Sequence, residues 1–189
     1  MKNYYGIILV FISGLLLSCG AASTATDTAK GSAQLDDLVA SRAFEIRSSW
    51  ARPMNTASMN AVANSGLLPA GSSVGQIDMI GNTNYLKVNG DEIEVFLPYF
   101  GDRQLSAGYQ QDTAIEFNGV PDEFSIDKNK KGTGYEIKIR MSNNMESFRL
   151  NVQLYPSLKS IITVISSHRT PIKYEGEVMR LAEKHEAGK

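Results

Sequence analysis

The segment Tyr85–Gly101, with the sequence YLKVNGDEIEVFLPYFG, is the strongest constraint on the fold of this chain. Asn89-Gly90 is favoured at the two central positions of a tight β-hairpin turn, because both positions need φ > 0. A turn of that length pairs Lys87 with Glu92, a favourable cross-strand contact. It also places a set of apolar side chains on one face of the hairpin: Leu86, Val88, Ile93 and Val95. The sequence therefore predicts an antiparallel hairpin with one buried face.

The N-terminus carries a second strong signal. Lys2 is followed by a mostly apolar run over residues 6–17. This run is too short for a bilayer core of roughly 30 Å, but it fits the hydrophobic region of a secretory signal peptide. It ends in Leu16-Leu17-Ser18-Cys19, which resembles a bacterial lipobox. In such signals the cysteine thiol is lipidated, the peptide is cut before the cysteine, and the new N-terminus is acylated.

These features predict three regions. We expect residues 1–18 to be a signal peptide, and acylated Cys19 to hold the protein in a lipid bilayer; the alternative is a plain signal peptide with an incidental cysteine. Residues 19–32 are small and polar without periodicity, which predicts a flexible tether. Residues 33–189 then form a single β-rich domain. Cys19 is the only cysteine, so no disulfide can form within the chain.

The charge balance limits the class of partner. The 19 basic and 20 acidic residues nearly cancel, which argues against nucleic acid. The 42% of hydrophobic residues argues against both disorder and an integral membrane protein. We expect the lipid bilayer, together with an envelope protein or a small-molecule ligand, as partners.

Most of the domain alternates apolar and polar residues, as half-buried β-strands do. Tyr135–Met141 and Phe148–Leu154 are the clearest pair, and the lysine-containing segment 127–132 before them is expected to be a hairpin tip. Leu158–Ser166 is apolar on both faces, which predicts a central strand covered on both sides. Shorter strands are predicted at 43–52, 74–80, 115–117, 124–126 and 169–174, with 115–117 and 124–126 pairing as one hairpin.

Helical spacing is limited to short segments, at 34–42, 58–64 and 177–186. The expected fold is therefore mainly β, with α+β as the alternative. About nine short strands would form an antiparallel sheet, closed as a sandwich or a partly open barrel, with a short N-terminal amphipathic helix.

Residues with catalytic chemistry are scarce. The sequence has no G-x-S-x-G, G-x-x-x-x-G-K, H-E-x-x-H or C-x-x-C motif. The histidines are His168 and His185; Ser167 adjoins His168, and on a strand their side chains would point to opposite faces. Glu175 and Glu177 have the spacing of paired carboxylates, but a solvated strand face explains them too. We assign no catalytic residue, no metal site and no cofactor, and favour a protein that is not an enzyme.

Three aromatic residues are candidates for a binding surface. Tyr99 and Phe100 lie between Pro98, which ends a strand, and a glycine; the alternative is that they plug one end of the sheet. Trp50 is the third candidate, although its spacing from Phe44 and Ile46 also fits a core position. Residues 54–72 have no clear pattern and are a candidate binding loop or lid.

Five short segments share a pattern with one known family: Arg42-Ala-Phe44-x-Ile46, Val88-Asn-Gly90-Asp91, Leu97-Pro98-Tyr99-Phe100-Gly101, Ser167-x-Arg169 and Tyr174-x-Gly176. Together they resemble the Bacteroidetes lipoprotein family known as domain of unknown function 4251. Tyr155-Pro156-Ser157 departs from the pattern, where a glycine-containing turn is expected.

The resemblance implies an envelope lipoprotein with a β-rich domain, and it supplies no activity or catalytic residues. Because Asp27 is the first acidic residue after Cys19, it also implies an outer-membrane location facing the periplasm. The leading hypothesis is a binding or scaffolding lipoprotein that is not an enzyme. The alternative is a hydrolase of envelope glycans or peptides that uses His168, Glu175 or Glu177.

Overall fold

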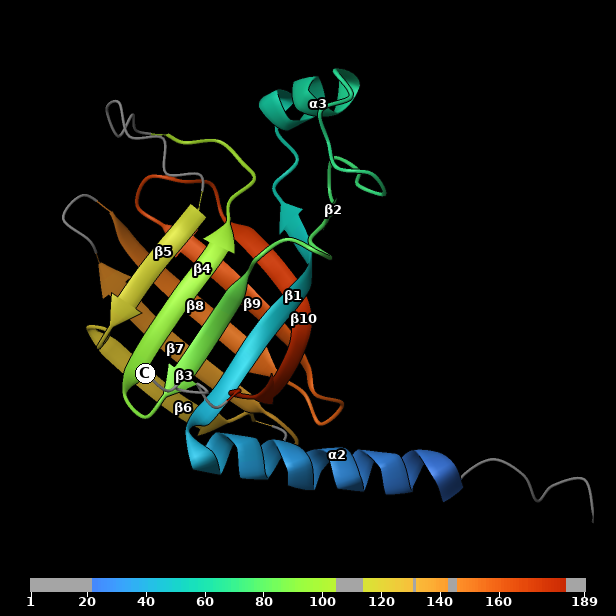
Figure 1. Ribbon diagram of the computed structural model, residues 1–189, viewed down its shortest axis with the longest axis vertical. Coiled ribbons are helices and arrows are strands. Elements are labelled where there is room, and N and C mark those ends of the chain that lie inside the picture. The colour runs from blue at the N-terminus through green and yellow to red at the C-terminus, as the bar shows by residue number, and fades with distance from the viewer. Residues whose placement is uncertain (1–21, 105–113, 131, 143–145, 183–189) are drawn as a thin grey trace, which may run out of the picture.

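The computed structural model describes residues 22–104, 114–130, 132–142 and 146–182, and within them the chain forms one antiparallel sheet with two helices. Nine strands follow one another in the order β5-β4-β3-β1-β10-β9-β8-β7-β6, and β2 pairs only with β1. The sheet curls into a half-barrel whose two edges are β5 and β6 (Figure 1). The mainly β fold predicted from the sequence is confirmed.

The elements have the following bounds. The helices are α2 (Ala22–Ser41) and α3 (Ala57–Asn64), and the strands are β1 (Ala43–Pro53), β2 (Ile77–Asp78), β3 (Tyr85–Asn89), β4 (Glu92–Pro98), β5 (Ala114–Gly119), β6 (Glu123–Lys128), β7 (Tyr135–Ser142), β8 (Ser147–Leu154), β9 (Lys159–Ser166) and β10 (Ile172–Arg180).

Alternation along the strands creates the core. On β7 and β8 the residues Ile137, Ile139, Leu150 and Val152 face the inside of the curl and are buried, as the sequence predicts. Burying one face of each strand is the main stabilising contribution in such a sheet, at roughly 25 cal/mol per Å² of apolar surface. The last turns of α2 contribute further buried apolar residues to the same core: Leu35, Leu38 and Val39.

The hairpin of β3 and β4 forms as predicted, but its register is wrong by two residues. Asn89 pairs with Glu92, so the tight turn is Gly90-Asp91, and only Gly90 has positive φ (65°). This pattern matches a type II′ turn, which places glycine first. Lys87 consequently pairs with Glu94, and their side chains form an ion pair of 3.0 Å. A shift of two residues keeps every side chain on its face, so the hydrophobic pattern does not distinguish the two registers.

The predicted hairpin between 115–117 and 124–126 is wrong. β5 pairs with β4, and β6 pairs with β7, so these two strands are the opposite edges of the sheet. The turn between them would place Val120 and Pro121 at its centre. Tight hairpin turns need positive φ there, whereas proline is fixed near −65° and valine disfavours such values. The chain therefore diverges after Gly119, whose φ is 140°.

Two predictions near the C-terminus are also wrong. β9 is an inner strand, but its second face is not covered, because Ile165 is 40% exposed. Residues 177–180 of the helix predicted at 177–186 are instead the end of β10, where Val178 pairs with Ile46 of β1. The period of two in Tyr174, Gly176 and Val178 explains this outcome, since all three are buried. Residues 183–189, including His185, lie outside the described residues.

The N-terminal helix is longer than predicted. α2 includes the predicted helical segment at its C-terminal end, and it also includes residues 22–32 of the expected tether. Asp36 accepts a hydrogen bond of 2.5 Å from the Tyr135 hydroxyl and lies 3.7 Å from the Lys128 ammonium. These contacts fix the end of α2 against the β6–β7 hairpin. The turn of this hairpin lies within the predicted tip 127–132, of which residue 131 is outside the described residues. The role of residues 19–32 as a spacer stays a prediction, and Cys19 lies outside the described residues.

Candidate functional site

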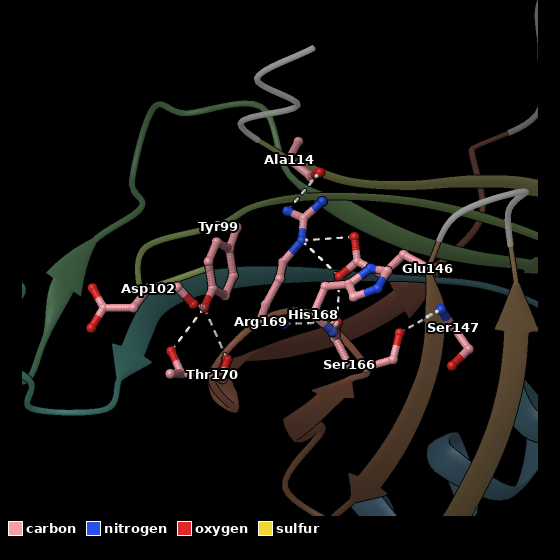
Figure 2. A network of polar contacts seen from close by, with 10 residues as sticks. Tyr99, Asp102, Ala114, Glu146, Ser147, Ser166, His168, Arg169 and Thr170 are labelled. Carbon is pink, nitrogen blue, oxygen red and sulfur yellow. Dashed lines mark hydrogen bonds and ion pairs between the residues drawn. The ribbon is translucent and has the colours of Figure 1, made fainter. Parts of the chain in front are cut away.

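The segment after β4 crosses one end of the half-barrel. Pro98 ends β4, and the Tyr99 hydroxyl lies 3.0 Å from the carbonyl oxygens of Asp102 and Thr170 and 2.8 Å from Thr170 Oγ1 (Figure 2). Burial raises the pKa of Tyr99 above its ordinary value. Its ring therefore packs at the end of the sheet, while the hydroxyl joins the 99–102 loop to the chain that leads into β10.

A buried ion pair lies beneath this loop. Arg169 is 4% exposed and Glu146 is 7% exposed. Arg169 Nε donates to both carboxylate oxygens of Glu146, at 2.9 and 3.1 Å, and Nη1 donates to the Ala114 carbonyl at 3.2 Å. The guanidinium also lies 5.1 Å from the ring centre of Tyr99 and 5.6 Å from that of Phe148. Such hydrogen bonds and ring contacts offset the desolvation of two buried charges.

Ser166 completes this arrangement. Its hydroxyl bonds to the Glu146 carboxylate, and its Oγ accepts hydrogen bonds from the backbone N–H groups of His168 (2.9 Å) and Arg169 (3.1 Å). We name Tyr99, Glu146, Ser166, Arg169 and Thr170 the Arg169 network. Figure 2 shows these side chains converging from separate segments of the chain.

Three of the five segments that carry the family resemblance meet at or near this network: Leu97–Gly101, Ser167-x-Arg169 and Tyr174-x-Gly176. The other two meet at the opposite end of the sheet, where Arg42 pairs with Asp91. Tyr174 is buried inside the curl and donates a hydrogen bond of 2.9 Å to the Pro98 carbonyl. Burial raises its pKa. A Cβ at Gly101 would lie 2.6 Å from the Tyr99 hydroxyl, so the loop passes too closely for a side chain there. The Arg169 network is therefore a structural connection between the 99–102 loop and the 166–170 turn, and the alternative reading of Tyr99 and Phe100, as a plug for one end of the sheet, fits best.

Trp50 does not occupy the core position that its spacing suggests. β1 has a bulge between Ser48 and Trp50, which reverses the alternation of the residues that follow. Ala51 is therefore buried, and Trp50 is half-buried on the outer face, opposite Asp78 and Glu175. Tyr99 and Phe100 instead pack against the core at the end of the sheet. Trp50 thus lies on a different surface from Tyr99 and Phe100.

The residues proposed for hydrolysis are also separated. Glu175 pairs with Arg52 at 2.6 Å, and Glu177 pairs with Lys159 at 2.5 Å, on the outer face of the sheet. His168 precedes β10, whereas Glu175 lies three residues into it, so about 10 Å of strand separates Glu175 from the start of β10. The two glutamates are thus used in surface ion pairs, and they do not converge with His168 on one pocket.

A hollow of about 500 Å³ lies where β1 and β3 separate. The Asn84 side chain lies at this fork, where Oδ1 accepts from Ser48 N–H (2.7 Å) and Nδ2 donates to the Ser48 carbonyl (3.0 Å). The basic residues beside it are also paired, Arg47 with Glu45 and Lys87 with Glu94. Asn84 therefore joins β1 to the chain that leads into β3 at the point where the two strands diverge.

The segment between β1 and β2 is largely exposed. We name residues 54–76 the arm. α3 forms within it, as predicted for 58–64, and Thr56 caps the helix by accepting a hydrogen bond from Met59 N–H (3.2 Å). Met59 is the only buried residue of the arm, all of which the structure describes. Figure 1 shows α3 standing away from the sheet, at the end opposite α2.

The composition of the arm is unusual for an exposed segment. Residues 54–76 contain no Asp, Glu, Lys or Arg and no aromatic residue. Protein surfaces usually carry roughly 25–35% charged residues. Exposed apolar side chains are present instead, at Met54, Val62 and Leu67. The lack of a clear pattern predicts a loop or lid in residues 54–72, but the absence of charge is the stronger signal.

Among the described residues, no group of three or more His, Cys, Asp or Glu side chains lies close enough together to hold a metal ion. Neither helix in the described part of the chain combines the length and the hydropathy needed to cross a bilayer.

Comparison with known proteins gives a family match. The family model described as Domain of unknown function (DUF4251) matches residues 27–178. A crystal structure of a DUF4251 family protein from Bacteroides eggerthii DSM 20697 is similar, with a TM-score of 0.49 and 9% sequence identity. The alignment covers 82% of this chain and 88% of that chain. A search of curated proteins found no match.

Proposed function

The chain belongs to the DUF4251 family, a family of unknown function, and we propose that it is a lipid-anchored envelope protein that binds a protein partner through the arm. In this proposal the signal peptide directs export, acylated Cys19 holds the protein in the outer membrane facing the periplasm, and the half-barrel is a rigid support. The exposure of the uncharged arm is the observation that carries the binding role.

The anchor rests on the sequence of the first residues. The apolar run 6–17 and the segment Leu16-Leu17-Ser18-Cys19 fit a lipoprotein signal. Two or more acyl chains anchor a protein stably, because each buried CH₂ contributes about 0.8 kcal/mol. Mass spectrometry of the N-terminal peptide tests this part, and an unmodified Cys19 would contradict it.

The binding role rests on the exposure of the arm and on its lack of charged side chains. α3 is an eight-residue helix, and isolated helices shorter than about 12–15 residues are marginal in water. In a free surface segment we would expect charges that favour solvation, yet the arm has none. The exposed apolar side chains of the arm lie among uncharged polar ones, and apolar surface rimmed by polar residues is typical of a contact site. We infer that a partner covers the exposed face of α3 and the turn that carries Leu67.

The chemistry of the arm favours a protein over a lipid surface. Membrane-binding segments usually combine basic residues with Trp or Tyr at the interface. Residues 54–76 have neither. The arm also lies at the end of the half-barrel opposite α2, the helix that follows Cys19 (Figure 1). The expected partner surface is therefore an uncharged, apolar patch on a protein.

Affinity capture with matched variants tests this function. Leu67 is 76% exposed on the arm, and Val120 is 69% exposed on the turn between β5 and β6. Full-length wild type, L67E and V120E would be captured from detergent-solubilised envelopes. We expect one protein to be recovered with wild type and V120E, and at least about tenfold less with L67E, which corresponds to 1.4 kcal/mol. Equal recovery with all three forms contradicts the proposal, as does binding of the arm to lipid vesicles alone.

A further inference from the structure

We propose that a hollow on the outer face of the sheet, where β7, β8 and β9 lie side by side, binds the phosphate group of a small soluble molecule. The hollow has a volume of about 240 Å³, and its lining includes Arg140, Arg149, Ile165 and three serines. No residue of the arm lines it. The inference therefore concerns a second site, goes beyond the proposed function and does not depend on it.

Two arginines lie next to each other at this hollow. Arg140 on β7 is directly opposite Arg149 on β8 in the register of the sheet, and both are exposed. Like charges at directly opposed positions of neighbouring strands destabilise a sheet. An anion bound between the two guanidinium groups replaces this repulsion with attraction. Arginine is also the side chain whose planar fork of donors matches the geometry of a phosphate or carboxylate.

The protein neutralises only part of the positive charge at the hollow. Glu123 pairs with Arg140 at 2.9 Å, from the neighbouring strand β6. The Glu146 carboxylate is buried and pairs with Arg169 at 2.9 Å. Arg149 makes no ion pair or hydrogen bond with the rest of the described chain, and no acidic side chain lines the hollow. The donors of Arg149 are therefore available to a ligand that carries negative charge.

Serine hydroxyls add neutral donors to the same surface. Ser147 lies two residues before Arg149 on β8, so the two side chains share the outer face. Ser167 Oγ accepts a hydrogen bond from the Ser147 N–H at 3.2 Å, which leaves the Ser167 O–H free to donate. The Ser166 hydroxyl, in contrast, is bonded to Glu146.

The number of donors favours phosphate over carboxylate. A carboxylate has about four acceptor sites, which is fewer than two guanidinium forks and two hydroxyls can fill. A phosphate monoester has three strongly accepting oxygens and a charge of about −1.5 to −2 at neutral pH. The hollow therefore matches a phosphate monoester in both charge and hydrogen bonding.

Position and size favour a soluble molecule over a lipid headgroup. Arg140 lies five residues along β7 from Tyr135, which contacts α2, so about 17 Å of strand separates the hollow from the helix that follows the expected anchor. The volume is below the roughly 300–1,000 Å³ of sites for drug-sized ligands, so it suits a phosphate with a short organic group. Ile165, which is 40% exposed and pairs with Arg149, offers that group an apolar contact.

Calorimetric titration of the full-length protein in phosphate-free detergent solution tests this inference, with glycerol 3-phosphate as the probe. R149Q removes the unpaired charge at the hollow. K173Q is the matched control, because Lys173 is an exposed cation on the same face that makes no ion pair with the described residues and does not line the hollow. We expect K173Q to bind like wild type and R149Q to lose at least about tenfold in affinity. R149K should fall between them, because it keeps the charge without the fork of donors.

Absence of saturable binding to wild type overturns the inference. An equal loss in R149Q and K173Q overturns it too, because that result indicates a general attraction of anions to basic surface. Vesicles that contain phosphatidic acid form the second arm of the experiment: binding to them without binding of glycerol 3-phosphate overturns the assignment of a soluble ligand. L67E, which tests the arm, should bind the probe like wild type, so this inference and the proposed function can fail separately.

Discussion

Arg169 donates from Nε to both carboxylate oxygens of Glu146, at 2.9 and 3.1 Å, and both side chains are almost fully buried. This pair joins the turn after β9 to the residue that precedes β8. Because the guanidinium also contacts the Tyr99 ring, the ion pair supports the loop that crosses the end of the half-barrel. We regard it as a structural centre of the domain, separate from the contact surface on the arm.

Removing one member of this pair should destabilise the domain strongly. R169M leaves the Glu146 carboxylate buried without its main partner, and we expect a loss of about 3–5 kcal/mol in the free energy of unfolding. The double variant R169M/E146L removes both charges and should lose less than R169M alone. Chemical denaturation of the three forms measures this difference. A double variant that is less stable than R169M would contradict the interpretation of the pair as two mutually compensating charges.

At Gly176, β10 passes very close to the backbone of β1. A Cβ at this position would lie 1.9 Å from the Arg47 carbonyl oxygen and 2.6 Å from the Ser48 Cα, and neither backbone atom can move cheaply. G176A should therefore lose about 4 kcal/mol or more, or fail to fold. Gly75 is the matched control, because its Cβ would meet nothing within 4 Å and its φ is ordinary. Thermal unfolding should show G75A unchanged, and equal effects in the two variants would contradict this account.

Tyr135 makes the stability of the domain sensitive to high pH. Its hydrogen bond to Asp36 raises its pKa from 10.0 to about 12, because the carboxylate disfavours a second negative charge. Because the pKa of Tyr135 is higher in the folded chain than in the unfolded chain, its hydrogen bond stabilises the fold fully below pH 10. This stabilisation is lost as the pH rises toward 12. We expect alkaline unfolding of the wild type to show this loss and Y135F to lack it. A titration of tyrosinate absorbance that gives Tyr135 an ordinary pKa would contradict the prediction.

The observed register of the β3–β4 hairpin can be tested by double-mutant cycles. Lys87 is paired with Glu94, so this pair should show a coupling energy of about 0.2–1 kcal/mol. The cycle between Lys87 and Glu92 should show none, because Glu92 lies opposite Asn89. Coupling in the second cycle and not in the first would show that the register predicted from the sequence is the true one.

The sequence was sufficient to predict a strand and its buried face wherever hydrophobic alternation allowed only one arrangement. β7, β8 and the buried face of β3 and β4 follow directly from the period of two. The hairpin register did not, because a shift of two residues keeps the faces and because Glu92 and Glu94 both offer a partner for Lys87. Pairing of β5 with β4 rather than β6 depended on the Val120-Pro121 turn, whose backbone limits outweighed the apparent hairpin pattern.

The candidate site was less predictable, since it depends on contacts distant in sequence. The bulge before Trp50 reverses the faces of β1 beside the close contact with Gly176, and alternation alone does not reveal it. Arg169 and Glu146 are buried because four segments that are distant in the sequence come together in the folded chain. The lack of charge in the arm, in contrast, is visible in the composition, and its significance becomes clear once the structure shows that the arm is exposed.

The central claim is that the arm is covered in the envelope, and the reactivity of a cysteine on it is the most direct measurement. S65C on the arm and S157C on the β8–β9 turn would be labelled with a water-soluble thiol reagent in intact envelopes and after dilution into detergent. We expect S65C to react several-fold more slowly in envelopes than in detergent, and S157C to react at similar rates in both. Equal protection ratios for the two cysteines would contradict the assignment of the arm as a contact surface.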